Sequence, residues 1–155
     1  MSDRVESPAG AVPAPRAHRA LPSDAPTRAP ASLTRVGCDV VELGRLEQVL
    51  ARNPRAFRGQ IFTAAEEAAA GSIGALARRF AVKEATLKAL GIGLVAGVHP
   101  TDIEVTARPD GGCDVRLAGA PALLGRGRTI HARTWIEAGH AAAIVWLGRA
   151  DGDPA

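Results

Sequence analysis

The chain has 155 residues, which is enough for one ordinary domain and leaves little room for a second. Hydrophobic residues make up 46% of the chain and aromatic residues only 3%, so the core must be mainly aliphatic and a base-stacking platform is not expected. The formal net charge of +3 favours an acidic partner, which could be a protein, a phosphate-rich ligand or a nucleic acid.

The two ends of the chain are expected to lie outside the domain. Residues 1–32 contain six prolines and no hydrophobic periodicity, which predicts a disordered tail without a signal peptide. Residues 150–155 are expected to be flexible, which leaves 33–149 as a single domain. The two cysteines form no CxxC pair or zinc motif, and the longest apolar run, 141–147, is too short to span a bilayer. These features predict a cytoplasmic protein without a membrane partner.

The domain is predicted to begin with a strand over residues 34–41. Alternation places Gly37, Asp39 and Val41 on one face of this strand. An aspartate is disfavoured inside a valine-rich strand. Asp39 could cap the helix that follows, or it could hold a hard divalent ion together with a second carboxylate.

Two helices are predicted next. The first covers residues 43–52 and leaves Arg45 and Arg52 outward on one face, because seven residues separate them. Such a face can be merely solvated or can bind an acidic partner. The second begins after Thr63, and Glu66 three residues later completes a capping box.

The longest helix is predicted over residues 74–90 and ends at a glycine, Gly91. Its apolar stripe carries Lys83 in the middle and Glu84 at the border, and Lys88 follows one turn after Glu84. Buried charge is costly unless it is paired or bound to an ion. Two interpretations therefore stay open. The charged residues could form a Lys–Glu pair that fixes packing, or they could form a site for an ion or a phosphate.

The C-terminal half reads as strands. A glycine-rich loop over 91–97 is followed by a predicted hairpin of strands 101–107 and 113–117. Two further strands are predicted over 128–136 and 140–147. Helices come first and strands later, without βαβ alternation. This order predicts an α+β fold with a long central helix packed on a mainly antiparallel sheet.

Three segments resemble motifs of the holo-acyl-carrier-protein synthases, which are the short-chain class of 4′-phosphopantetheinyl transferases. Residues 37–47 (GCDVVELGRLE) resemble their N-terminal motif, and residues 61–66 (IFTAAE) resemble their second motif. Residues 79–93 (RFAVKEATLKALGIG) are similar to their most specific motif, and residues 101–105 (TDIEV) follow at the right distance. The likeness covers roughly residues 34–148.

The resemblance implies a fold, an activity and partners. The fold would be that of the 4′-phosphopantetheinyl transferases. The activity would be Mg²⁺-dependent transfer of 4′-phosphopantetheine from coenzyme A to a serine of an apo acyl carrier protein. Its products would be holo carrier protein and adenosine 3′,5′-bisphosphate. The family also implies an acidic carrier protein as partner, and a homotrimer whose active sites are shared between neighbouring subunits.

The resemblance assigns roles to single residues. It implies that Asp39 and Glu84 hold the magnesium ion and that Lys88 lies at the transferring phosphate, so Glu84 and Lys88 are the expected catalytic residues. Glu84 or a metal-bound water could deprotonate the serine. Arg45, with Arg52 beside it, is expected to bind the carrier. The residues expected to bind coenzyme A are Arg79, Lys83, Lys88, Gly91 and Gly93.

Two positions depart from the family pattern and keep alternatives open. The Ser/Thr–His pair before the last strand is replaced by Trp135 and Ile136, and a basic–Pro pair is replaced by Cys113 and Asp114. These changes motivate a first alternative, a non-catalytic relative that binds carrier protein. A basic nucleic-acid-binding module is the second. The scarcity of aromatic residues and the lack of a recognition motif disfavour it, so no nucleic-acid partner is expected.

Overall fold

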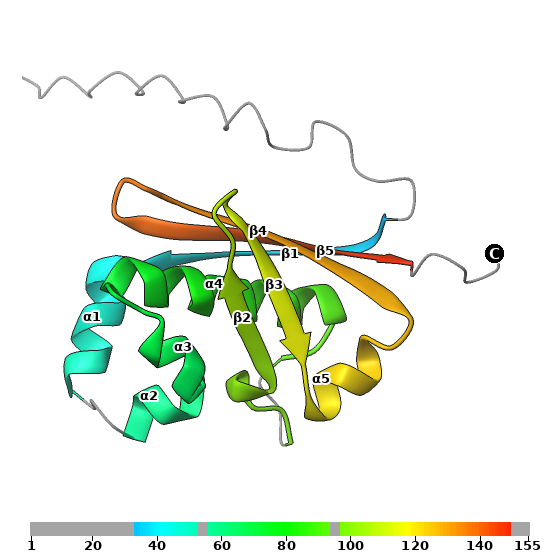
Figure 1. The fold of residues 1–155 in the computed structure, drawn as a ribbon, viewed down its shortest axis with the longest axis horizontal. Helices are drawn as coiled ribbons and strands as arrows, with labels where there is room; N and C mark the ends of the chain where they lie inside the picture. The colour runs from blue at the N-terminus through cyan, green and yellow to red at the C-terminus, as the bar shows by residue number, and fades with distance from the viewer. Residues whose placement is uncertain (1–32, 53–55, 94–96, 150–155) are drawn as a thin grey trace, which may run out of the picture.

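The computed structural model describes residues 33–52, 56–93 and 97–149 (Figure 1). The tails predicted at 1–32 and 150–155 lie outside these residues, so their disorder stays a prediction. Within the described ranges, no helix is both long enough and apolar enough to cross a membrane.

The centre of the molecule is a five-stranded antiparallel sheet in the order β1-β5-β4-β3-β2. A tight turn at Ala138 and Gly139, both with positive φ, joins β4 to β5. The Gly139 carbonyl also accepts a hydrogen bond of 3.0 Å from the Leu43 N–H, which ties this turn to the helix after β1. The strands are β1 (Leu33–Glu42), β2 (Ile103–Ala107), β3 (Gly112–Leu117), β4 (Arg128–Glu137) and β5 (His140–Arg149).

One long helix, α4 (Ile73–Leu90), lies along the face of the sheet formed by β1 and β5 (Figure 1). Three shorter helices gather at the N-terminal end of α4 and one lies beyond its other end (Figure 1). The shorter helices are α1 (Leu43–Arg52), α2 (Ala56–Ile61), α3 (Ala64–Ala68) and α5 (Gly119–Leu124), and the turn η1 (Pro100–Asp102) precedes β2.

Local signals explain where α4 begins and ends. The Ser72 hydroxyl accepts a hydrogen bond from the Ala75 N–H at the start, and Gly91 ends the helix with a φ of 76°. Gly37 on β1 lies so near the Ala85 carbonyl of α4 that any side chain there would collide with the helix backbone. This approach presses the inner face of β1 onto α4.

The core has two parts. One lies between α4 and the sheet, and it is mostly aliphatic, as the composition predicts. The other fills the space between α4 and the short helices, with Leu46, Leu50 and Phe62 among its buried members. The opposite face of the sheet is less covered, and Val40 on β1 is 63% exposed there.

The predicted architecture is confirmed in outline. The α+β class, the antiparallel sheet and the bounds of α1 agree with the sequence analysis, and Gly37, Asp39 and Val41 share the inner face of β1. Helix α2 was not predicted, because six residues are too few to display a helical period.

Candidate active site

A cleft of about 630 Å³ opens beside the C-terminal end of β1, between α1 and α4. It brings together Asp39 from β1, Arg45 from α1 and Glu84 from α4. Asp39 and Glu84 lie 45 positions apart in the chain and come to one cleft because β1 and α4 pack side by side. The full lining is Asp39, Val40, Val41, Glu42, Arg45, Leu46, Val49, Phe57, Phe80, Glu84 and His140. Asp39 and Glu84 are the residues predicted to hold the magnesium ion, and Arg45 is the residue predicted to bind the carrier protein.

Asp39 forms an ion pair with Lys88 at the edge of the cleft. The Lys88 ammonium donates to Asp39 Oδ1 at 2.7 Å and to the Cys38 carbonyl at 3.0 Å. The hydrogen bond to Asp39 raises the pKa of Lys88, so this side chain is charged at neutral pH. The Lys88 side chain remains 53% exposed and can reach a ligand in solvent.

Glu84 faces the same place from α4, but it is incompletely satisfied. Its Oε1 atom is buried, and no described residue forms a hydrogen bond with it. Burial raises the pKa of Glu84 above its ordinary value, the nearby Asp39 charge raises it further, and the Lys88 charge lowers it. A carboxylate in this setting is stabilised by an additional cation.

The two carboxylates suit a hard divalent cation such as Mg²⁺. Among the described residues no group of three or more acidic, histidine or cysteine side chains is positioned to hold a metal. Magnesium is usually bound by one or two carboxylates, with water and substrate phosphate as the other ligands. The oxygens of Asp39 and Glu84, including the unpaired Oε1, therefore fit this ion as the protein part of its coordination shell.

Lys83 lies elsewhere, in a buried network away from the two carboxylates, and its predicted contact with a coenzyme A phosphate stays a prediction. Its side chain is 0% exposed. Its ammonium forms an ion pair with Glu66 at 2.7 Å and donates to the Ile103 and Pro100 carbonyls at 2.6 Å and 2.9 Å. An ammonium group has three protons, so these three acceptors use all of them. Burial lowers the pKa of Lys83, while the hydrogen bond and charge of Glu66 oppose that shift.

Glu66 has more roles than its capping box indicated. The box itself is confirmed, since the Thr63 hydroxyl accepts from the Glu66 N–H and the Thr63 N–H donates to Glu66 Oε2. The same carboxylate accepts from the Val105 N–H at 2.9 Å and pairs with Lys83. Glu66 thus connects α3, β2 and α4.

Arg79 is also removed from the cleft. It is 7% exposed, and its Nη1 donates to the Ala75 carbonyl at 3.1 Å on its own helix. Its Nε is buried and meets no acceptor in the described part of the chain. The structure does not bring Arg79 to the carboxylates, so its predicted contact with coenzyme A stays a prediction.

The two glycines predicted to bind coenzyme A differ in their surroundings. Gly91 is explained by the helix end, because it adopts a left-handed conformation and its N–H donates to the Lys88 carbonyl at 3.0 Å. Arg35, which the sequence analysis missed, donates to the Leu90 carbonyl at 2.9 Å and lies over Gly91. Gly93 is exposed, with open space where a Cβ would lie. The contacts of Gly91 and Gly93 with coenzyme A both stay predictions.

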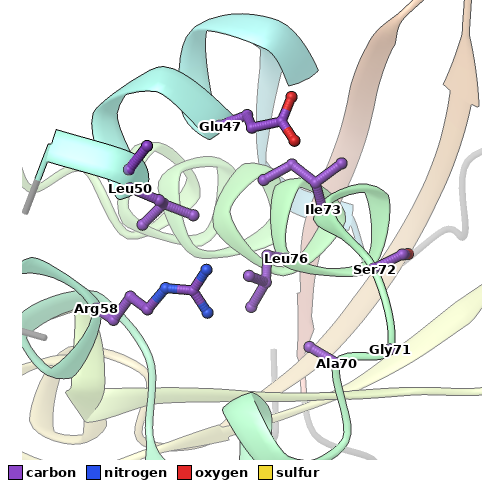
Figure 2. A pocket seen from close by; sticks show the side chains of 9 residues that line it. Glu47, Leu50, Arg58, Ala70, Gly71, Ser72, Ile73 and Leu76 are labelled. Atoms are coloured by element: carbon purple, nitrogen blue, oxygen red, sulfur yellow. The ribbon is translucent and has the colours of Figure 1, made fainter. Parts of the chain in front are cut away.

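The arginines of α1 lie on its outer surface. Arg45 and Arg52 are both exposed, and Arg45 also lines the cleft. A second hollow of about 390 Å³ lies on the other side of α1, with Leu50, Ile73 and Leu76 in its wall and Glu47 and Arg58 at its edge (Figure 2). It contains one charge of each sign and no pair of carboxylates, so the cleft is the better candidate for catalysis.

The departures from the family pattern have packing explanations. Ile136 is 44% exposed and leans on the start of α4, where a side chain at Gly74 would meet its Cδ1 atom. Cys113 is buried in the core, and burial raises the pKa of its thiol, so it is an inert apolar residue.

The comparisons with known proteins agree with the sequence motifs. The model of the 4′-phosphopantetheinyl transferase superfamily matches residues 35–145. A holo-[acyl-carrier-protein] synthase of Desulfovibrio desulfuricans is 42% identical over 87 residues, which cover 55% of this chain and 70% of that protein. One of Methylobacterium radiotolerans is 38% identical over 113 residues, which cover 70% of this chain and 78% of that protein.

A solved structure supports the same assignment. The holo-(acyl-carrier-protein) synthase of Bacillus anthracis, in complex with CoA (3′,5′-ADP), is 28% identical with a TM-score of 0.61, and the match covers 76% of this chain and 98% of that one. The chain belongs to the 4′-phosphopantetheinyl transferase superfamily. Within that superfamily its relatives are holo-acyl-carrier-protein synthases, and the resemblance drawn from the sequence is confirmed.

Proposed function

We propose that this protein transfers 4′-phosphopantetheine from coenzyme A to a serine of an apo acyl carrier protein. The products are holo carrier protein and adenosine 3′,5′-bisphosphate. The single observation that carries the proposal is the grouping of Asp39, Glu84 and Lys88 at the cleft between β1 and α4 in a member of this superfamily. Phosphoryl transfer needs mainly positioning and neutralisation of charge, which two carboxylates with a cation and a lysine can supply.

Each of the three residues has a role in this proposal. Asp39 and Glu84 hold a Mg²⁺ ion, which neutralises phosphate charge and polarises the phosphoryl group when it is bound. Lys88 would contact the transferring phosphate, since its side chain is half exposed at the edge of the cleft. Glu84, whose pKa is raised by burial, is a candidate base for the carrier serine, and a water is the other.

The basic outer surface of α1 is the proposed binding site for an acidic carrier protein. Arg45 reaches the rim of the cleft, and Arg52 lies two turns further along the same face. A guanidinium group grips a carboxylate with two parallel hydrogen bonds. A carrier bound there would present its serine to the carboxylates of the cleft.

The uncovered face of the sheet is the proposed subunit interface of a homotrimer. Val36 and Val40 of β1 are large apolar side chains that are exposed on this face in the single chain. Exposed apolar surface of this kind is typical of an assembly interface. We place the protein in the cytoplasm, where coenzyme A and carrier protein would meet it.

A non-catalytic carrier-binding relative is the second candidate, and Ile136 at the place of the family histidine favours it. The two functions make different predictions with the same reagents. Incubation with apo carrier protein, coenzyme A and Mg²⁺ should raise the carrier mass by one phosphopantetheine if the chain is an enzyme. Carrier binding without any mass change, even at high protein concentration, would support the non-catalytic candidate.

The Asp39→Ala and Glu84→Ala variants serve as controls for that assay. Each should abolish the mass change and keep the circular dichroism spectrum of the folded protein, because both side chains line the cleft and lie outside the two core clusters. Full activity of either variant would contradict the proposed metal site.

A further inference from the structure

Lys88 already occupies the carboxylate that the proposed metal ion requires. Its ammonium lies 2.7 Å from Asp39 Oδ1 and is held there by a second hydrogen bond to the Cys38 carbonyl. Asp39 belongs to β1 and Lys88 to α4, so this contact joins the two elements that form the site. A divalent cation that binds Asp39 therefore meets a cation that is already there.

The charges at the site make this occupancy favourable without a metal. Two carboxylates, Asp39 from β1 and Glu84 from α4, line the cleft, and the Asp39 charge makes ionisation of Glu84 less favourable. Lys88 is the cation that acts on both of them. The cleft is also lined by three other charged or titratable residues, Glu42, Arg45 and His140. Among the described residues, none of these three forms an ion pair with Asp39 or Glu84.

We propose that Lys88 is the resident counter-ion of the metal-free site, and that a divalent cation displaces it from Asp39. This inference rests on the proposed function, because it takes Asp39 and Glu84 as the metal ligands. Two cations that share one carboxylate compete, and by linkage each weakens the binding of the other. The metal would release the Lys88 ammonium, which is then available for a phosphate oxygen. The lysine and the metal would thus become ready for substrate together.

Metal affinity in the absence of coenzyme A tests this directly. We would titrate Mn²⁺ into the wild-type protein and into Lys88→Gln, and measure the dissociation constant by calorimetry or by electron paramagnetic resonance. Lys88→Gln should bind Mn²⁺ roughly five- to tenfold more tightly, since both the competing ion pair and a nearby positive charge are removed. Lys88→Arg keeps the charge and should stay near the wild-type affinity.

Arg45→Gln is the matched control for charge alone. Arg45 lines the same cleft but forms no ion pair with Asp39 in the described part of the chain, so its removal should tighten Mn²⁺ binding less than the removal of Lys88. Equal affinities of the wild-type, Lys88→Gln and Arg45→Gln proteins would overturn the proposal and leave the metal site intact. Equal tightening by both glutamine variants would also overturn it, since general charge would then explain the effect.

Two further outcomes are informative. No Mn²⁺ binding by any of the proteins would overturn the metal site itself, and with it the magnesium part of the proposed function. Thermal unfolding supplies a second readout. Without metal, the melting temperature of Lys88→Gln should lie below that of the wild type, and this difference should disappear at saturating Mn²⁺. If Mn²⁺ leaves the difference in melting temperature unchanged, Lys88 stays paired with Asp39 in the metal-bound protein, and the proposed displacement is contradicted.

Discussion

Two lysines of the same helix, five residues apart, form ion pairs in opposite environments. Lys83 is fully buried against Glu66 and two carbonyls, whereas Lys88 is half exposed against Asp39 and one carbonyl. Both belong to the segment that resembles the most specific family motif. The comparison teaches that the motif combines a lysine buried inside the fold with a lysine half exposed at the candidate site, and burial distinguishes them.

The largest expected effect is on stability at the buried pair. Lys83→Met should lower the free energy of unfolding by about 3–5 kcal/mol, because it leaves the Glu66 carboxylate buried without its cation. Lys88→Met should cost at most about 1 kcal/mol, since that pair is half exposed. Urea denaturation of both variants measures the difference.

A double variant sharpens this test. Lys83→Met combined with Glu66→Gln removes both buried charges and should recover part of the loss, because no unpaired charge remains. If the single variant Lys83→Met were as stable as Lys88→Met, the contrast between the two lysines would be lost.

The next effect is on catalysis, for which Lys88 is expected to matter more than Lys83. Lys88→Met should lower kcat for carrier modification by about 10²-fold or more, as the loss of one charge-stabilising donor does in other enzymes. Its circular dichroism spectrum should match the wild type. A wild-type kcat for Lys88→Met would show that Lys88 takes no part in catalysis.

A smaller effect is expected at the carrier surface. Arg45→Ala should raise the KM for carrier protein roughly fivefold and that for coenzyme A little, and added salt should shrink the difference by screening the wild-type attraction. Arg116→Ala is the control, because Arg116 is also exposed but lies on β3 beside Glu104. Equal rises in both KM values, or a defect that salt leaves unchanged, would make Arg45 structural.

The smallest effect is the pH dependence set by Glu84. Its pKa in the folded protein is raised, so the folded state keeps this proton at a pH where the unfolded state has lost it. Wild-type stability should therefore fall, relative to Glu84→Gln, as pH rises from about 4.3 through the raised value. Urea denaturation without divalent metal, at several pH values, measures this. If the free energies of unfolding of the two proteins change with pH in parallel, folding does not raise the pKa of Glu84.

The sequence predicted what local signals specify. The bounds of α1, the Thr63 capping box and the stop at Gly91 depend on neighbours in the chain, and all are confirmed. The partner of Lys83 could not be predicted in this way, because Glu66 lies 17 positions earlier and meets it only after α3 packs on α4.

The same limit applies to the site itself. Asp39 and Glu84 were grouped through the family motif, and the structure brings both to one cleft. The contact of Asp39 with Lys88 and that of Arg35 with the end of α4 are tertiary, and no spacing in the chain indicates them. Sequence thus predicts the elements well, and packing decides which charges meet.

The proposed function requires coenzyme A to contact Lys88, whereas the hydrogen bonds of buried Lys83 leave it no proton for a phosphate. Calorimetric titration of coenzyme A, in the presence of Mg²⁺, into the wild-type, Lys88→Met and Lys83→Met/Glu66→Gln proteins tests this directly. We expect Lys88→Met to weaken binding by about tenfold, or about 1.4 kcal/mol, and the folded double variant to bind like the wild type. Weakened binding by the double variant with unchanged binding by Lys88→Met would contradict it.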